Sequence, residues 1–334
     1  METGTPHWIK PEAWLEVVRQ EYLAGFVRPG GSTLKVVIPK EPADREIVAR
    51  GLQALAQDEG FVFASVDAVT TKVHLIERLF HAIAAQIPWK ALANRFVRSL
   101  LEQEYRLPGE GEPLTIERLA ALNERDEAVL GNDVKKLLEK ALMRDFRMCQ
   151  EFRFAVIEMC LEALQQGRLT DDGIIGDWLR GELRLISALK PCLIFQKVVR
   201  HNARHILLSL AHWIRLAGKQ GLVLTINVGR YLLDKRPKEP EGSNYYSRAA
   251  TLEAYEVLRQ LIDGTDDTEG CFVVVLAPAD FLTNERRGLG AYEALRFRVE
   301  DEVWDQRMPN PLATLVRISL VDEASGLVGE GGQA

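Results

Sequence analysis

Residues 218–234 read Gly-Lys-Gln-Gly-Leu-Val-Leu-Thr-Ile-Asn-Val-Gly-Arg-Tyr-Leu-Leu-Asp, and they contain the clearest signal of the fold class. A long helical pattern ends at Gly218, and a short apolar segment rich in β-branched residues follows over 222–226. Such a run between glycines is typical of a strand that is buried on both faces, as in a parallel sheet covered by helices on each side. The stretch therefore predicts an α/β fold. Its strand ends in Asn227, where no carboxylate stands.

The composition is that of an ordinary soluble globular protein. The 334 residues are 47% hydrophobic and 27% charged, which is enough to bury a large core. The formal net charge of −6 gives no support to nucleic-acid binding beyond a local basic patch. No segment has the pattern of a signal peptide or a membrane span, so we expect a cytoplasmic protein with no membrane contact. The widely spaced cysteines predict free thiols and no metal site: Cys149, Cys160, Cys192 and Cys271.

Four further apolar segments predict the other strands, at 34–38, 61–66, 271–276 and 312–320. The first two are separated by a helical pattern over 46–59, which makes them a βαβ unit with parallel strands. We therefore predict a parallel sheet of about five strands.

The region between the second and third predicted strands has a helical pattern almost throughout. We predict that residues 89–217 form a large helical insertion, with helical pattern from Trp178 to Leu216. The α/β domain would then consist of residues 1–88 and 218–320, followed by a flexible tail over 321–334.

A phosphate-binding loop would stand between the first strand and the first helix, where residues 39–46 read Pro-Lys-Glu-Pro-Ala-Asp-Arg-Glu. A P-loop has the pattern Gly-x-x-x-x-Gly-Lys-Ser/Thr. Its glycines let backbone N–H groups approach phosphate oxygens, and its lysine and hydroxyl reach the phosphates and magnesium. Here Pro39 and Asp44 stand at the glycine positions, Arg45 at the lysine position and Glu46 at the hydroxyl position. Proline lacks the N–H donor, and the carboxylates repel phosphate.

The end of the third predicted strand lacks the second part of a nucleotide site. In P-loop NTPases this strand ends in an acid that holds magnesium, whereas the amide of Asn227 is uncharged and a poor ligand for that ion. We interpret Lys40, Arg45 and Asn227 as vestigial nucleotide positions. We expect neither ATP nor Mg²⁺ as a cofactor, and no catalytic residues.

Two stretches resemble the ATP-binding domain proteins of bacteriophage-exclusion (BREX) systems. Trp178-Leu-Arg-Gly, the helix to Gly218 and Gly-Leu-Val-Leu-Thr-Ile at 221–226 resemble the approach to the acidic strand of that family. Ala-Tyr-Glu-Val-Leu-Arg-Gln-Leu-Ile-Asp at 254–263 and Arg-Arg-Gly-Leu-Gly-Ala-Tyr-Glu-Ala-Leu-Arg-Phe-Arg at 286–298 are similar to the segment that follows it.

This resemblance implies a P-loop NTPase-like fold of the AAA+/ASCE type and a place in a bacterial anti-phage defence cluster. Family members are P-loop ATPases expected to work with a methyltransferase and other cluster proteins on DNA. Because the phosphate-handling residues are replaced here, the leading hypothesis is a non-catalytic pseudo-ATPase that acts as a scaffold or interaction subunit, with an active ATPase relative among its candidate partners. One alternative is an active or nucleotide-gated ATPase that uses Arg45 as its phosphate cation, and another is a DNA-binding module of the same system.

Two basic groups are candidate contact sites. In ring-forming P-loop ATPases, arginines after the fourth strand can reach a neighbour's nucleotide, which predicts partner contacts here; the alternative is a solvated basic cluster. The residues concerned are Arg286, Arg287, Arg296 and Arg298. A basic helix face could contact nucleic acid through Arg204, Arg215 and Lys219.

The same helix carries His201, His205 and His212 at a spacing that a metal site could use. Because no carboxylate stands nearby in the sequence, we predict a polar or interface face there and no metal.

Overall fold

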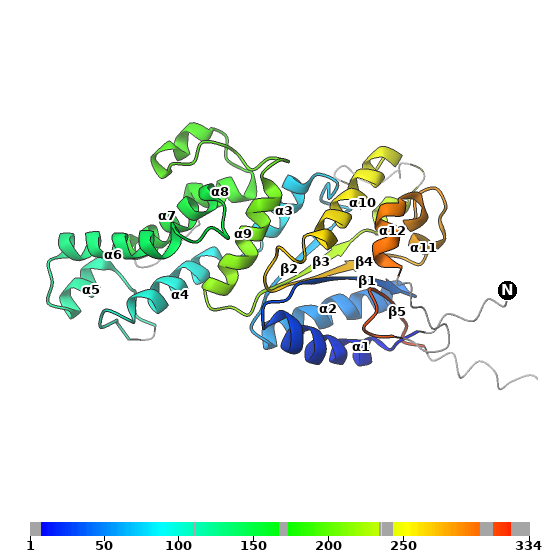
Figure 1. Ribbon diagram of the computed structural model, residues 1–334, viewed down its shortest axis with the longest axis horizontal. Helices are drawn as coiled ribbons and strands as arrows, with labels where there is room; N and C mark the ends of the chain where they lie inside the picture. The colour runs from blue at the N-terminus through cyan, green and yellow to red at the C-terminus, as the bar shows by residue number, and fades with distance from the viewer. Residues whose placement is uncertain are drawn as a thin grey trace, which may run out of the picture.

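The structure is a computed structural model that describes residues 8–109, 111–166, 173–233, 235, 243–300 and 310–321. It contains one five-stranded sheet, all parallel, with strand order β2-β3-β4-β1-β5 (Figure 1). The predicted fold class is confirmed, because this sheet with its covering helices is consistent with a P-loop NTPase-like fold. The strands are β1 (Thr33–Pro39), β2 (Val62–Asp67), β3 (Leu222–Asn227), β4 (Cys271–Leu276) and β5 (Leu315–Ile318).

Two separate apolar cores hold helices against the two faces of the sheet. On one face, α1 (Pro11–Val17), the π-helix η1 (Val18–Val27) and α2 (Pro42–Asp58) pack through Trp14, Leu23 and Leu52 against strand residues such as Phe272. The other face is covered by α3 (Ile76–Ala84), α9 (Ala203–Leu216), α10 (Arg248–Asp263) and α12 (Glu293–Val299) (Figure 1). Short η3 (Gly229–Leu232), α11 (Asp280–Thr283) and η4 (Leu289–Ala291) lie in the connections that follow β3 and β4.

A block of helices is inserted between β2 and β3, as predicted. Besides α3 and α9, it contains α4 (Trp89–Leu101), α5 (Ile116–Leu122), α6 (Glu127–Leu142), α7 (Gln150–Gln166), α8 (Gly173–Arg180) and the 3₁₀ helix η2 (Ile186–Cys192). The block lies to one side of the sheet (Figure 1), and one continuous apolar core joins the two. The predicted boundaries at residues 88, 217 and 320 remain predictions, and all but the first residue of the tail lies outside the described part of the chain.

The predicted helical pattern from 178 to 216 is interrupted over residues 181–202, where the structure has no α-helix and only the 3₁₀ helix η2. Helix α8 ends at Arg180, and α9 begins only at Ala203. Gly181 has a left-handed φ of +74° and ends α8, and Pro191 cannot continue an α-helix because it has no N–H. Leu193 also adopts a left-handed φ of 58°, which turns the chain away from helical geometry.

At Gly221, directly before β3, the backbone geometry requires a residue without a Cβ. Gly221 has φ +149°, and a Cβ built there would lie 2.1 Å from the carbonyl oxygen of Gly270. That same oxygen accepts the Leu222 N–H at 2.8 Å, where β3 and β4 start to pair. We expect Gly221→Ala to reduce the free energy of unfolding by about 1–3 kcal/mol, measured by urea denaturation. Gly290→Ala is the control, because a Cβ at Gly290 meets no atom within 4 Å.

Candidate functional site

The carboxyl ends of the strands form the edge where a nucleotide would bind in an open α/β sheet. Asp67, Asn227 and Leu276 are register partners at the ends of β2, β3 and β4. The end of β1 leads into α2, which begins at Pro42 and not at Glu46 as the sequence pattern indicated. The N-terminus of α2 therefore lies at this edge, in the place from which helix N–H groups would bind phosphate.

A carboxylate of the chain itself fills part of that place. Asp44 is buried, with 2% of its surface exposed. Its Oδ2 accepts the N–H of Glu41 at 3.0 Å, and its Oδ1 accepts the N–H of Leu320 at 3.0 Å. The negative charge favoured at a helix N-terminus is thus supplied internally. The sequence contained the signal, since proline at the first helical position and an acid two residues later mark a helix start.

Asn227 is bound to its neighbours in the same edge. Its Nδ2 donates to Asp67 Oδ2 at 2.7 Å, and its Oδ1 accepts the N–H of Gly229 at 3.2 Å. Asp67 Oδ1 in turn accepts the N–H of Val69 at 2.7 Å. A carboxylate therefore lies beside the end of β3 after all, contributed by the adjacent strand β2. Sequence reasoning missed this pair, although Asn227 was predicted to end its strand and Asp67 directly follows the predicted strand 61–66.

The space left at this edge is small. A cavity of about 110 Å³ lies between the β1–α2 connection and the ends of β3 and β4, and it is lined by Pro39, Lys40, Glu41, Pro42, Arg45, Asn227, Ala277, Pro278 and Ala279. Cavities that hold organic ligands measure about 300–1,000 Å³. The three vestigial positions predicted from sequence are thus brought together, around a space smaller than a nucleotide pocket.

The two cations of this cavity differ in their surroundings. Lys40 Nζ lies 5.4 Å from the ring centroid of Trp8 and so contributes a cation–π contact. Arg45 is half-buried, and within the described ranges its guanidinium forms no hydrogen bond or ion pair. Arg45 is therefore the cation at this edge that is available to an added anion.

The predicted arginine group divides into buried and exposed members. Arg287 is buried, and its Nη1 donates to the carbonyl oxygens of Tyr246 at 2.8 Å and Tyr231 at 3.2 Å. Its Nη2 donates to the hydroxyl of Tyr245 at 3.1 Å. Arg287 therefore links the segment after β4 to the connection between β3 and α10. It does not belong to an exposed arginine surface. Arg286, its neighbour, is exposed.

Arg296 and Arg298 bind carboxylates near the surface. Arg298 forms a two-point ion pair with Asp263 at the end of α10, and Arg296 lies 3.6 Å from Glu300. The hydroxyl of Tyr292 donates to Glu256 at 2.6 Å. The two stretches that resembled the BREX family, 254–263 and 286–298, thus pack against each other through their own polar residues.

Glu256 makes the stability of this region depend on pH. Hydrogen bonds from Arg259, above all, and from Tyr292 and Gln260 outweigh burial and lower the pKa of Glu256 to about 2. A carboxylate with a lowered pKa stabilises the fold fully above its unfolded pKa, and the contribution is lost as the pH falls through the folded value. We expect Glu256→Gln to destabilise the protein more at pH 6 than at pH 2.5, as measured by urea denaturation at each pH. Equal effects at both values would contradict this.

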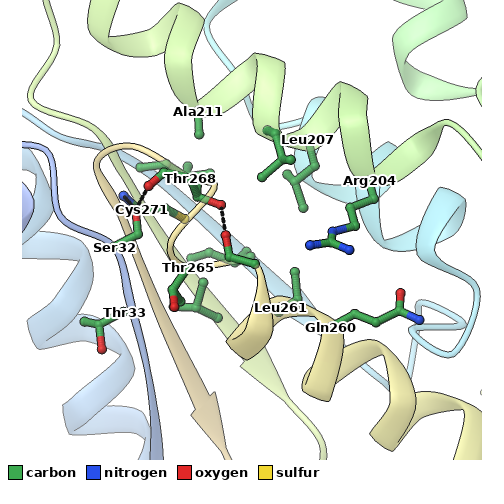
Figure 2. A pocket seen from close by; sticks show the side chains of 15 residues that line it. Ser32, Thr33, Arg204, Leu207, Ala211, Gln260, Leu261, Thr265, Thr268 and Cys271 are labelled. Carbon is green, nitrogen blue, oxygen red and sulfur yellow. Dashed lines mark hydrogen bonds between the residues drawn. The ribbon is translucent and has the colours of Figure 1, made fainter. Parts of the chain in front are cut away.

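The first residue of the predicted nucleic-acid face, Arg204, lies over an apolar cleft between α9 and α10. Figure 2 shows its side chain among residues of that cleft, which include Leu207, Leu261 and Gln260. Its Nη2 lies 3.6 Å from Asp267. The cleft encloses about 30 Å³, space for about one water molecule.

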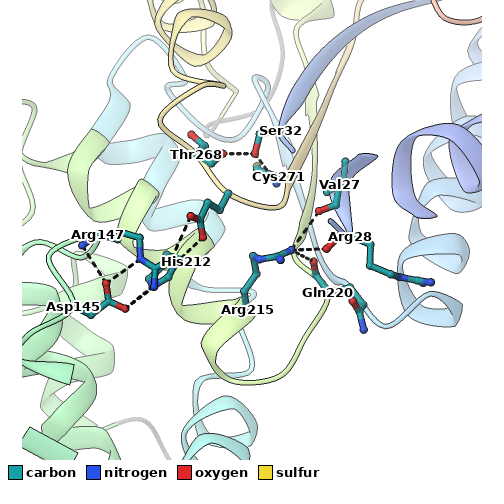
Figure 3. Close-up of polar contacts among 11 residues, drawn as sticks. Val27, Arg28, Ser32, Asp145, Arg147, His212, Arg215, Gln220, Thr268 and Cys271 are labelled. Atoms are coloured by element: carbon teal, nitrogen blue, oxygen red, sulfur yellow. Dashed lines mark hydrogen bonds and ion pairs between the residues drawn. The ribbon is translucent and has the colours of Figure 1, made fainter. Parts of the chain in front are cut away.

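The second residue, Arg215, binds the backbone. Its Nη1 donates to the carbonyl oxygens of Val27, Arg28 and Gln220 at 3.3, 3.1 and 3.0 Å (Figure 3). This guanidinium ties the end of α9 to the end of η1. The third residue, Lys219, is half-buried. The three residues of this group consequently have different environments, and one of them has a structural role.

His212 has two carboxylate partners, so the expectation that none lies nearby was wrong. Its Nε2 lies 2.7 Å from Asp145 Oδ2 and its Nδ1 3.2 Å from Glu269 Oε2 (Figure 3). Asp145 precedes α7 in the helical block, whereas Glu269 precedes β4 in the sheet. The buried imidazole therefore joins the two parts of the protein. His201 and His205 are exposed and take no part in this contact.

The described residues contain no group of three or more histidine, cysteine, aspartate or glutamate side chains arranged for a metal ion. The four cysteines are free thiols. No helix within the described ranges is both long and apolar enough to cross a membrane.

Comparison with known protein families matches residues 26–328 to the family described as "BREX system ATP-binding protein BrxC/D". Comparison with curated proteins and comparison with solved structures each give no match. The match covers most of the chain and agrees with the parallel sheet and with the packed segments at 254–263 and 286–298. The chain therefore belongs to the BrxC/D family of BREX system ATP-binding proteins.

Proposed function

We propose that this chain is a non-catalytic, P-loop-like subunit, a pseudo-ATPase that serves as a scaffold in a BREX anti-phage defence complex. It works in the cytoplasm and binds other proteins of the cluster, with DNA reached directly or through those partners. The exposed Arg286, together with Arg296 and Arg298, offers such proteins a basic contact near α12.

The observation that supports this proposal most is the internal carboxylate at the start of α2. A triphosphate placed there would meet Asp44, whose two oxygens already accept N–H groups of Glu41 and Leu320. Displacing Asp44 would leave a buried charge without partners, which costs several kcal/mol in the low-dielectric interior. Magnesium would meet the amide of Asn227, which is already bound on both its atoms. These residues do not fit ATP with Mg²⁺.

A second candidate function is an atypical, nucleotide-gated ATPase. Arg45 favours it, because this cation lines the 110 Å³ cavity and has no partner within the described ranges. Asp67 beside Asn227 could then supply the carboxylate that β3 lacks. This candidate requires Asp44 to leave the helix start.

A measurement of ATP hydrolysis distinguishes the scaffold from the atypical ATPase. We expect no ATP hydrolysis above background by the full chain with Mg²⁺, either alone or with duplex DNA, and no change in Arg45→Ala. Turnover that is lost in Arg45→Ala, while the variant keeps the melting temperature of the wild type, would support the atypical ATPase and remove the scaffold proposal.

A further inference from the structure

The irregular segment between α8 and α9 presents apolar side chains to solvent. It is the green segment that leads from α8 to α9 in Figure 1. Phe195 is 64% exposed and Leu193 is 50% exposed, although neighbours Ile194 and Leu189 are fully buried. The segment is thus anchored by some apolar residues while it displays others. We call its exposed part the basic–apolar surface, which consists of Leu185, Leu193, Phe195 and Val199 with Arg184, Lys190 and Arg200.

Hydrogen bonds fix the shape of this segment. Lys197 Nζ donates to the carbonyl oxygens of Leu183 at 2.9 Å and Arg184 at 3.1 Å, which holds the two ends of the segment together. The indole N–H of Trp178 donates to the carbonyl of Gln196 at 3.0 Å. The backbone that carries the exposed apolar side chains is therefore fixed in the free chain, which lowers the entropic cost of binding.

The charge of this surface is opposite to that of the whole chain. Residues 182–200 contain four basic side chains and one acidic side chain, Glu182, which is bound to Arg180. Within the described residues, no carboxylate pairs with Arg184, Lys190 or Arg200. An apolar centre with unpaired cations around it fits an apolar surface with acidic surroundings.

The turn between α5 and α6 has that complementary character. Val129 is 55% exposed and Leu122 is also exposed, on either side of the turn. We call this the acidic–apolar surface, which consists of these two residues with the exposed carboxylates of Glu117, Glu124 and Glu127. None of these three carboxylates forms an ion pair within the described part of the chain. The exposed arginines of the same stretch, Arg118 and Arg125, are paired with Glu112 and Asp133, so the unpaired charge here is negative.

A left-handed residue ends a helix in each surface. In the described residues, two non-glycine residues have a left-handed φ, Leu193 at 58° and Glu124 at 52°. Leu193 directly follows η2, and Glu124 follows the C-cap residue of α5. The conformation ends each helix and sets the direction of the chain that follows.

We propose that the basic–apolar surface of one copy of this chain binds the acidic–apolar surface of a second copy. The contact joins two different surfaces, so it is a heterologous interface that leaves one free surface of each kind on a pair. Phe195 and Leu193 would pack against Val129 and Leu122, with the arginines and Lys190 facing the glutamates. The contact does not depend on a nucleotide. Its test is therefore independent of the test of the scaffold proposal.

Nucleic acid fits the basic–apolar surface less well. Stacking on bases needs aromatic rings or arginine planes spaced along a groove. This surface has one aromatic ring, that of Phe195, while its other apolar side chains are aliphatic.

Sedimentation velocity of the full chain over a range of concentrations tests the proposal. We expect association that increases with concentration and weakens with salt. Phe195→Asp and Val129→Asp should each abolish it, because each variant loses one of the two surfaces. An equimolar mixture of the two variants should form dimers and no larger species, since only one productive contact remains. Phe297→Asp, a change of an exposed ring outside both surfaces, should associate like the wild type.

Three results would overturn the proposal. These are a wild type that stays monomeric at every concentration, variants that associate like the wild type, and a mixture that remains monomeric although both variants keep the wild-type melting temperature. Salt-sensitive binding of a monomer to duplex DNA that is lost in Phe195→Asp would assign the basic–apolar surface to nucleic acid instead.

Discussion

Replacement of Arg287 by methionine is expected to lower the free energy of unfolding by about 2–5 kcal/mol, the cost of leaving buried carbonyl groups without hydrogen-bond donors. The guanidinium is buried and donates to the carbonyl oxygens of Tyr231 and Tyr246 and to the hydroxyl of Tyr245. Methionine fills much of the volume but donates no hydrogen bond, so the carbonyls are left buried without partners. Urea denaturation followed by circular dichroism measures the loss.

Arg286→Met is the matched control, because Arg286 is the next residue along the chain and is exposed. Exposed substitutions of this kind change stability by about 0.5 kcal/mol or less. If Arg287→Met were as stable as Arg286→Met, the assignment of Arg287 to the interior would be wrong, and its earlier interpretation as a partner-contacting arginine would regain support.

His212→Ala is expected to destabilise the protein by about 2–4 kcal/mol, since it leaves two carboxylates close together without the group that joins them. Asp145 and Glu269 lie within hydrogen-bonding distance of the two ring nitrogens in the wild type. Because these carboxylates belong to the helical block and to the sheet, the variant should also increase hydrogen exchange at the start of α7 and in the loop before β4. Hydrogen exchange read by mass spectrometry checks the location.

His205→Ala, an exposed change on the same helix, should leave both measurements unchanged. The pH dependence gives a further check. Burial alone would raise the pKa of Asp145, but hydrogen bonds from His212 and Arg147 lower it below its usual value. The stabilisation from Asp145 is therefore present above its unfolded pKa and is lost as the pH falls below that value. A His212→Ala variant with the same acid sensitivity as the wild type would contradict this assignment.

The strands of this protein could be predicted from sequence because each is a short apolar run between turn residues. The predicted segments 222–226 and 271–276 correspond to β3 and β4 to within one residue. The insertion between β2 and β3 followed from its helical periodicity. The resemblance to the BREX family rested on segments that pack together in the structure, such as Glu256 with Tyr292.

The parts that could not be predicted depend on contacts between distant residues. Periodicity continued through 181–202, yet Gly181 and the left-handed Leu193 end the helix there, and the apolar residues of this segment are partly exposed. The partners of His212 come from two loops far away in sequence. The role of Asp44 depends on Leu320, a residue at the other end of the chain. In each case the sequence shows the residue type but not its partner.

Isothermal titration of the full chain with ATP and Mg²⁺ asks whether a triphosphate can bind at the start of α2. With Asp44 seated at the start of α2 and Asn227 bound to Asp67, we expect no saturable heat of binding at micromolar to submillimolar nucleotide. Stoichiometric binding with a micromolar dissociation constant would contradict the account, because the triphosphate would then have displaced a buried carboxylate from the helix start.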